Sequence, residues 1–265
     1  IYVVDKRQAL HFQQVFDLAV RAGWAGEGVL HHVAFGTILG ADKKPLKTRS
    51  GDSLFLDDLL REGFSSYDNS LVGQKNASHP SALAVKEASV IGALKYYDLH
   101  LTPSDDYVFD WEYVLSTQGQ SAPYIQNAVV RIDSVLAKVD NRLIASIQSP
   151  PETLNDFLRD VQNALQDVAW NDLSEPAKKL TMATLTSFSS FAGQKPHDVV
   201  SSLMRMAKSM HAFYENTQVL GGAQEKDHLA LLHATGLSLV YGASLLGVST
   251  FPSVVNTPSP KAIKP

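Results

Sequence analysis

The hydrophobic period of this chain changes near Ser78, and that change limits the possible fold more than any single motif does. Before it, short β-branched runs alternate with stretches whose apolar residues recur every three or four positions. After it, only the helical spacing continues, as far as Leu246. Alternating strand and helix patterns are typical of an α/β sheet, whereas uninterrupted helical spacing is typical of a bundle. We therefore expect a mostly α protein in two parts.

The residues before the change predict part of a parallel sheet. Residues 1–4 are β-branched and are expected to form a buried strand. Residues 8–21 carry an apolar helical face, and residues 29–39 are apolar and β-rich, which indicates a second strand. Residues 41–51 are a polar, basic loop, and a further helix is expected to begin at Asp57. Strand, helix and strand in this order favour an α/β architecture.

The residues after the change predict a helical bundle. The clearest pattern lies in residues 122–139, where Ile125, Val129 and Ile132 recur at three- and four-residue intervals. Ser174 precedes a Glu-Pro pair, which is typical of a helix start. The last residues, 256–265, are rich in Pro and Lys and are expected to be an unstructured tail. Further helices are expected over residues 81–97, from residue 152 onward, over residues 196–214 and over residues 226–246.

Composition excludes several classes of protein. Hydrophobic residues make up 45% of the chain and charged residues 19%, which is typical of a soluble globular protein. The absence of cysteine excludes disulfides, thiolate metal sites and a cysteine nucleophile. A net charge of −4 argues against non-specific binding to nucleic acid, because counterion release needs a positive surface. We recognise no signal peptide, and the apolar residues 237–248 are too few to span a bilayer, so we expect a cytoplasmic protein that binds no membrane.

The basic loop is the most informative stretch of the chain. Four cations, at positions 43, 44, 47 and 49, fall within seven residues and are followed by a hydroxyl and a glycine. Directly after a strand, such a loop can place positive charges and backbone N–H groups around a phosphate chain. A solvated surface hairpin is the alternative interpretation, and composition alone does not decide between the two.

The surroundings of the loop resemble the signature-loop region of class I arginyl-tRNA synthetases. The segment His32-Val33-Ala34-Phe35-Gly36 leads to Leu39-Gly40, the lysine loop, Lys47-Thr48-Arg49-Ser50-Gly51 and then Leu56-Asp57-Asp58-Leu59-Leu60. The family has a histidine-valine-aromatic-glycine strand, a glycine, a proline-containing lysine loop and a threonine-arginine-x-glycine turn in this order. Residues 47–51 occupy the place of the lysine-methionine-serine-lysine-serine loop, although its second lysine is absent and Arg49 lies nearby instead.

This resemblance implies the residues of an ATP site. His32 and Phe35 are expected to lie under the adenosine, with Val33 and Gly36 beside them. Three cations are expected to act on the phosphates, first Lys47 and then Lys44 and Arg49. The loop residues expected to bind ATP are Lys47, Thr48, Ser50 and Gly51.

The first residues of the chain are similar to a second part of the same family. Residues 2–12, Tyr-Val-Val-Asp-Lys-Arg-Gln-Ala-Leu-His-Phe, match its strand-then-helix segment. The glutamine of that segment helps to read the guanidinium of substrate arginine, which implies that role for Gln8 and a lesser one for His11. The alternative is that Gln8 is an ordinary helix-start residue and His11 a packed histidine.

The resemblance continues through the bundle. Residues 92–96 and 106–111 resemble the junction between the catalytic and anticodon domains, and residues 119–126, Gly-Gln-Ser-Ala-Pro-Tyr-Ile-Gln, resemble the segment that follows. His228 stands where the family usually has an arginine. Tyr124, Gln126 and Tyr214 are expected to contact tRNA, since stacking and base-edge contacts need such side chains. Tyr124 and Gln126 are equally compatible with packing at a helix start.

Taken over the whole chain, the resemblance implies a domain plan and an activity. Residues 1–75 would be the C-terminal part of a Rossmann-like catalytic domain, 76–118 a junction, 119–255 the anticodon-binding bundle and 256–265 a tail. The implied enzyme activates arginine with ATP and Mg²⁺ and transfers it to arginine tRNA, as a monomer with no protein-bound metal.

The chain is also expected to be a piece of a longer protein. It begins inside a predicted strand, and the histidine-x-glycine-histidine motif of class I enzymes does not occur in its 265 residues. We therefore expect the isolated chain to be inactive.

Two other functions are compatible with parts of the sequence. One is a non-catalytic module that binds tRNA, another RNA or a protein partner through the bundle alone. The other is a metal-dependent hydrolase built on His11, His31 and His32, but no helical histidine pair has the spacing that a zinc site usually needs.

Overall fold

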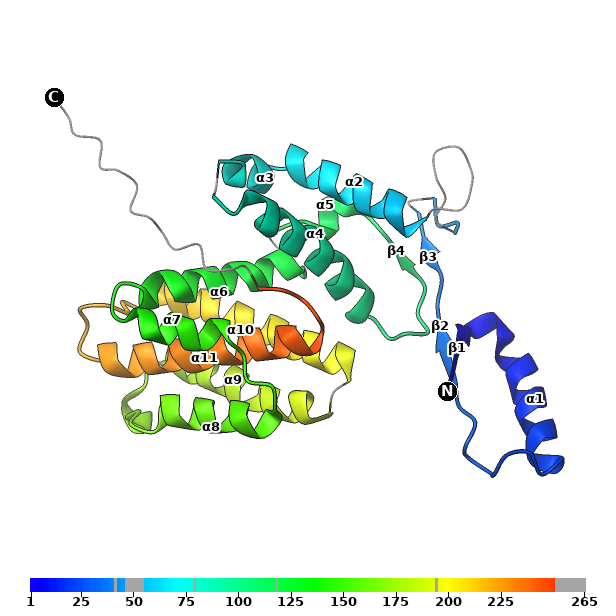
Figure 1. Cartoon of the computed structure of the whole chain (residues 1–265). Coiled ribbons are helices and arrows are strands. Elements are labelled where there is room, and N and C mark those ends of the chain that lie inside the picture. Colours follow the sequence, from blue (N-terminus) through cyan, green and yellow to red (C-terminus); the bar gives the residue numbers. More distant parts are fainter. Residues whose placement is uncertain (41, 46–54, 79, 118, 194, 251–265) are drawn as a thin grey trace. The chain divides into compact units, whose positions relative to one another are not determined.

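The computed structural model describes residues 1–40, 42–45, 55–78, 80–117, 119–193 and 195–250. Its chain divides into two compact units (Figure 1). The first unit is Ile1–Leu59 with Leu101–Trp111, and the second is Leu60–His100 with Glu112–Pro265. The segment 101–111 therefore returns to the first unit after the chain has entered the second.

The first unit is built on two short parallel strand pairs. Strand β1 (Tyr2–Asp5) leads through a 3₁₀ turn, η1 (Lys6–Gln8), to helix α1 (Ala9–Arg21). Strand β2 (His32–Phe35) then pairs with β1 in register, Tyr2 opposite His32 and Asp5 opposite Phe35. A strand, a crossover helix and a parallel strand confirm the expected α/β character of this part.

The expected second strand, residues 29–39, is wrong as a single element. It is two strands, β2 and then β3 (Ile38–Leu39), and β3 pairs with β4 (Tyr107–Val108) rather than with β1. The break falls at Gly36, whose backbone N–H donates to the carbonyl of Pro103 at 2.8 Å. The ladder changes partner there because the neighbouring backbone now belongs to residues 101–111.

Strand β1 was expected to be buried, and this is also wrong within the described residues. Tyr2 and Val3 are 45% and 64% exposed. Here β1 has β2 on one edge, and α1 covers it through aromatic contacts: the ring of Tyr2 lies 5.5 Å from Phe12 and 5.2 Å from Phe16. The apolar residues on the uncovered surface of the strand therefore remain accessible.

Helices form nearly all of the rest of the described chain, as the sequence predicted. Helix α11 lies at the centre of the second unit and contacts α6, α7, α8, α9 and α10 (Figure 1). The 3₁₀ turn η2 (Trp170–Asp172) connects α8 to α9. The helices are α2 (Leu56–Asn69), which begins in the first unit, α3 (Leu71–Asn76), α4 (Ala82–Leu99), α5 (Trp111–Val114), α6 (Ala122–Leu136), α7 (Asn141–Gln148), α8 (Leu154–Leu165), α9 (Glu175–Gly193), α10 (Pro196–Asn216) and α11 (Glu225–Leu245).

Helix α11 is a core helix. It has the length and apolar character that a membrane span would need, with 21 residues, but 72% of its apolar window is buried inside the protein. Its glycines show how tightly it packs, because a Cβ at Gly242 would lie 2.6 Å from the Phe191 ring and one at Gly236 would lie 2.6 Å from Ile147. Such close packing on several sides is typical of a helix in the middle of a bundle.

A buried carboxyl group on α6 makes the stability of the bundle depend on pH. Asp133 is 7% exposed, and burial raises its pKa to about 6, although a hydrogen bond from Gln148 partly opposes the shift. An unfolded aspartate titrates near pH 4. The folded protein therefore holds this proton more tightly, and the stabilisation from it is complete below about pH 4 and is lost as the pH rises through about 6.

We predict that Asp133→Asn removes this contribution. The quantity to measure by urea unfolding is the difference in the free energy of unfolding, variant minus parent. This difference should increase by about 1–3 kcal/mol from pH 4 to pH 7. The exposed carboxylate of Glu152 provides the control, and Glu152→Gln should leave the difference nearly constant over that range. A pH-independent difference for Asp133→Asn would show that this carboxyl group is not the source.

Candidate functional site

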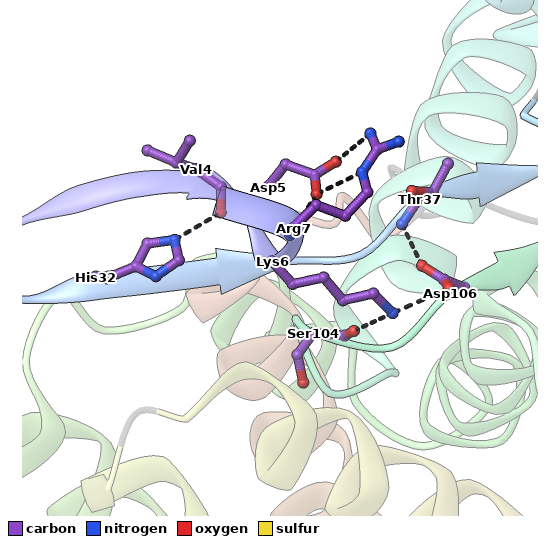
Figure 2. Close-up of polar contacts among 8 residues, drawn as sticks. All are labelled: Val4, Asp5, Lys6, Arg7, His32, Thr37, Ser104 and Asp106. Carbon is purple, nitrogen blue, oxygen red and sulfur yellow. Dashed lines mark hydrogen bonds and ion pairs between the residues drawn. The ribbon is translucent and has the colours of Figure 1, made fainter. Parts of the chain in front are cut away.

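The carboxyl ends of β1 and β2 meet a set of paired charges in the first unit (Figure 2). At the end of β1, Asp5 accepts the backbone N–H of Arg7 at 2.8 Å and its Nε and Nη2 at 2.9 and 2.6 Å. This guanidinium lowers the pKa of Asp5 to about 2. The aspartate also caps η1, so it fixes the direction in which the chain leaves the strand.

A second carboxylate, Asp106, lies between two segments of the same unit. Its Oδ2 pairs with Lys6 Nζ at 2.9 Å, and its Oδ1 accepts the backbone N–H of Thr37 at 2.7 Å (Figure 2). The pKa of Asp106 is lowered, first by the Thr37 amide and then by Lys6. Lys6 also donates to the carbonyl of Ser104 at 3.2 Å. The turn after β1 and the turn after β2 are thus held by one segment, residues 104–106.

Gly36 allows the turn after β2 to touch that segment. A Cβ at this position would lie 2.0 Å from the Asp105 carbonyl oxygen and 2.4 Å from its carbon. Because the obstacle is backbone, no side-chain movement relieves it. The sequence resemblance assigned Gly36 to the ATP site, and the structure gives it a steric requirement of its own.

The other predicted residues of the ATP strand divide between its two faces. His32 faces α1: its ring stacks on Phe12 with centroids 5.2 Å apart, and its Nε2 donates to the Val4 carbonyl at 3.1 Å. Val33 and Phe35 are 41% and 43% exposed. Since side chains alternate along a strand, His32 and Phe35, three positions apart, lie on opposite faces of β2. Their expected contact with the adenosine stays a prediction.

The two predicted arginine-binding residues are both accessible. Gln8 ends η1 directly before α1 and makes no side-chain cap, so its amide is not committed to the helix start. His11 lies on the first turn of α1, exposed, with its ring edge-on to Phe12 at 5.5 Å. Positions 8 and 11 lie one helical turn apart, which brings both side chains to the same end of α1.

The described part of the lysine loop forms a tight turn. Gly40 donates to the Lys44 carbonyl and Lys43 to the Gly40 carbonyl, both at 2.9 Å, and Leu39 bridges Pro45. Lys44 is exposed, and its backbone N–H donates to Asp42 at 3.1 Å. The other expected loop residues, Lys47, Thr48, Arg49, Ser50 and Gly51, lie outside the described residues.

The sequence did not predict a groove that lies beside β2 in the first unit. It has a volume of about 710 Å³ and is bordered by α1 and by the connection from α1 to β2. Among the predicted site residues that the structure describes, only His32 lines the groove, together with polar residues such as Asp17, Arg21 and Glu27. Among the residues that the structure describes, no cluster of three or more potential metal ligands occurs.

Two of the predicted tRNA contacts lie in one cluster of the second unit. Tyr124 is half-buried, edge-on to His211 at 4.6 Å, and Tyr214 is 40% exposed with the Arg131 guanidinium 5.5 Å from its ring. Arg131 also pairs weakly with Glu215 at 3.9 Å. Burial raises the pKa of Tyr124 and lowers that of His211, so both rings stay neutral near pH 7. Helices α6 and α10 thus bring Tyr124, Tyr214 and the Arg131 guanidinium into one cluster, with the guanidinium over the Tyr214 ring.

The third predicted tRNA contact, Gln126, faces the interior of the second unit, so the structure contradicts this prediction. Its side chain is fully buried, and its Nε2 donates to the carbonyls of Ala88 at 3.0 Å and Ser249 at 2.8 Å. A base-edge contact would require the amide to leave both bonds. The alternative of helix-start packing therefore describes Gln126, which ties α6 to α4.

Sequence reasoning missed three side chains that organise these sites: Lys6, Asp106 and Arg131. Lys6 and Asp106 are 100 residues apart, so no local pattern connects them. Arg131 lies seven residues after Tyr124, two turns along one face of α6, and that spacing was a usable signal.

Comparison with known proteins gives consistent matches along the chain. Residues 1–111 match the family model of tRNA synthetases class I (R), catalytic domain, and residues 125–253 match the DALR anticodon binding domain. The arginine–tRNA ligase of Laribacter hongkongensis is 36% identical over 264 residues, covering 96% of this chain and 42% of the relative. That of Frankia casuarinae is 35% identical, covering 94% and 40%. The chain thus spans about two fifths of the length of these relatives.

Solved structures of low sequence identity share the fold. An arginyl-tRNA synthetase from Thermus thermophilus superposes with a TM-score of 0.71 at 20% identity, covering 95% of this chain and 40% of that one. One from Plasmodium falciparum gives 0.67 at 24% identity, covering 96% and 41%.

We predict that Gly36→Ala disrupts the turn after β2. The added Cβ has no room against the Asp105 carbonyl, so the turn must move, at a cost of about 1–3 kcal/mol in the free energy of unfolding. Amide hydrogen exchange should be faster at positions 36 and 37, whose backbone N–H groups donate to residues 103–106 in the parent. Gly26→Ala is the matched control, because a Cβ there meets only Val29 at an ordinary 3.4 Å. Equal exchange in the two variants would contradict this steric account.

Proposed function

This chain belongs to the arginyl-tRNA synthetase family, and on that premise we propose that it supplies the lysine loop and the anticodon-binding bundle of an arginine–tRNA ligase. The observation that carries the proposal is the succession of two matches, a catalytic one over residues 1–111 and an anticodon-binding one over residues 125–253. Relatives with 35–36% identity over nearly all of the chain bear the name arginine–tRNA ligase.

The proposed domain plan follows the chain. Residues 1–75 contribute to the catalytic domain, residues 76–118 form the junction and residues 119–255 form the anticodon-binding bundle. Ser121 caps α6, the first helix of the proposed bundle, by accepting the Tyr124 N–H at 3.3 Å. The compact units divide the chain differently, because they group residues 60–100 with the bundle. Residues 256–265 are the proposed tail and lie outside the described residues.

The first proposed step joins arginine to AMP. A carboxylate oxygen of arginine attacks the α-phosphorus of ATP, and pyrophosphate leaves. The reaction asks mainly for positioning and for cations near the developing negative charge. We assign the cations to Lys47, Lys44 and Arg49, with Thr48, Ser50 and Gly51 beside the phosphates and Mg²⁺ arriving with ATP.

The strand and turn residues position the reactants in this proposal. Val33 and Phe35, which share the exposed face of β2, offer an apolar surface to the adenosine. Gly36, which has no side chain, allows the nucleotide to approach the backbone closely. Gln8 and His11 at the start of α1 read the arginine guanidinium. His32 supports this surface from the opposite face through its contact with Phe12.

The second proposed step transfers arginine to tRNA. A ribose hydroxyl at the tRNA 3′ end attacks the arginyl carbonyl, and AMP leaves. The cluster of Tyr124, Arg131 and Tyr214 is the proposed RNA contact of the bundle, because unpaired bases stack on aromatic rings and guanidinium planes. We propose that the ligase is a cytoplasmic monomer.

A non-catalytic tRNA- or partner-binding module is the second candidate function. It is favoured by one observation: the anticodon-binding match over residues 125–253 covers the bundle that such a module would use. The two functions differ in what the product of the complete reading frame does with ATP.

We predict that the 265-residue chain alone gives no ATP–pyrophosphate exchange, because the histidine-x-glycine-histidine motif is missing from it. The product of the complete reading frame should exchange pyrophosphate into ATP in the presence of arginine and arginine tRNA. Exchange by the isolated chain, with contaminating enzyme excluded by a Lys47→Met preparation, would overturn the first expectation. A complete protein that binds tRNA without exchange would favour the non-catalytic module.

We predict that the chain binds arginine tRNA more tightly than a non-cognate tRNA when both are titrated at the same salt concentration. Tyr214→Ala should weaken cognate binding by about 1–3 kcal/mol through loss of base stacking. Trp170→Ala is the control, since that ring is similarly exposed at 44% but lies on η2. Equal binding of both tRNAs, or equal losses in the two variants, would argue against this surface.

A further inference from the structure

The Asp106 carboxylate joins two segments whose proposed roles differ. Its Oδ2 holds Lys6, which lies in η1, and the same 3₁₀ turn ends at Gln8. Its Oδ1 holds the backbone N–H of Thr37, which directly follows Gly36 at the end of the β2 turn. One carboxylate therefore connects the proposed arginine-reading turn to the proposed nucleotide-binding strand (Figure 2).

The neighbouring charges explain why Lys6 pairs with Asp106. The nearest carboxylate in sequence, Asp5, is occupied by Arg7 through contacts of 2.6 and 2.9 Å. Lys6 turns instead to residues 104–106, where it meets both the Ser104 carbonyl and the Asp106 carboxylate. The alternation of Asp5, Lys6 and Arg7 thus produces two separate pairs, and only the second connects distant segments.

We propose that Asp106 is a positioning residue of the proposed ligase, setting the distance between Gln8 and the turn after β2. This inference rests on the proposed function for the roles of those two segments. Asp106 acts through Lys6 and Thr37, since each of its oxygens already accepts a protein group. It contributes no group to the reaction itself.

The roles of the two Asp106 carboxylate oxygens can be distinguished by substitution. Asp106→Asn keeps one carbonyl-type oxygen for the Thr37 N–H but loses the charge that holds Lys6. Lys6→Met keeps the apolar stem and removes the same ion pair from the other side. Asp106→Ala removes both links, and Asp106→Glu restores the charge. Asp105→Asn neutralises the adjacent exposed carboxylate and is the matched control.

The structural readout is amide hydrogen exchange on the 265-residue chain. In Asp106→Asn and Lys6→Met, exchange at Arg7 and Ala9, which report on η1, should be about two- to fivefold faster while Thr37 stays protected. In Asp106→Ala, Thr37 should also exchange faster. Asp106→Glu should recover part of the protection in η1, and Asp105→Asn should match the parent.

The kinetic readout is tRNA-dependent ATP–pyrophosphate exchange by the product of the complete reading frame. Asp106→Asn and Lys6→Met should each raise the KM for arginine about two- to fivefold with little change in the KM for ATP or in kcat. The double variant should be no worse than either single one, because both remove the same pair. Asp106→Ala should raise both KM values.

The outcomes separate this inference from the proposed function. Unchanged exchange in η1 for Asp106→Asn would overturn the positioning role whatever the activity of the protein. Uniform losses of kcat for all variants, Asp105→Asn included, would also overturn it, since they would report general destabilisation. A parent protein with no pyrophosphate exchange but with the expected amide pattern would reject the ligase assignment and leave the Asp106 link established as a structural one.

Discussion

The arrangement of the first unit depends on where the backbone N–H groups of Gly36 and Thr37 find acceptors. Both leave the ladder at the end of β2, and both are satisfied by residues 103–106, at 2.8 Å by the Pro103 carbonyl and at 2.7 Å by the Asp106 carboxylate. Polar backbone groups need such partners wherever water is displaced. Because these acceptors lie about 70 residues further along the chain, the first unit is complete only after residues 101–111 return to it.

The second unit follows a different principle, in which apolar packing around one helix fixes the arrangement. Helix α11 contacts five others and accommodates them through small residues, since even a methyl group at Gly242 would meet Phe191 at 2.6 Å. A few buried polar side chains then fix the alignment of particular pairs of helices. Gln126 does this between α6 and α4, where Gly92 leaves room for its amide: a Cβ there would lie 3.0 Å from Nε2.

The sequence predicted the elements that depend on local periodicity. It did not predict the features that depend on residues distant in the chain. The main helices of the bundle were recognised because burial imposes a period of 3.6 on each of them, whereas α7, with eight residues, was too short to show it. The split of residues 29–39 into β2 and β3 was missed, since the partner of β3 lies at Tyr107–Val108. No sequence pattern near Thr37 predicts that β3 pairs with these residues. Gln126 and Asp133 were open to better prediction, because they lie seven residues apart along the buried stripe of Ile125, Val129 and Ile132.

The chemistry of the α6 and α10 cluster also bears on the proposed binding of tRNA by a chain with a negative net charge. The net charge of −4 argues against non-specific binding of RNA through counterion release over the whole surface. The cluster instead combines two tyrosines with one guanidinium, and Glu215 at 3.9 Å offsets part of the positive charge of Arg131. In the proposed tRNA contact, binding at this cluster would come from stacking and shape, which distinguish one RNA from another, more than from phosphate attraction, which does not. Under the proposed function, an RNA that presents no unstacked base to Tyr124 and Tyr214 would gain little from this cluster, and that difference would provide the selectivity.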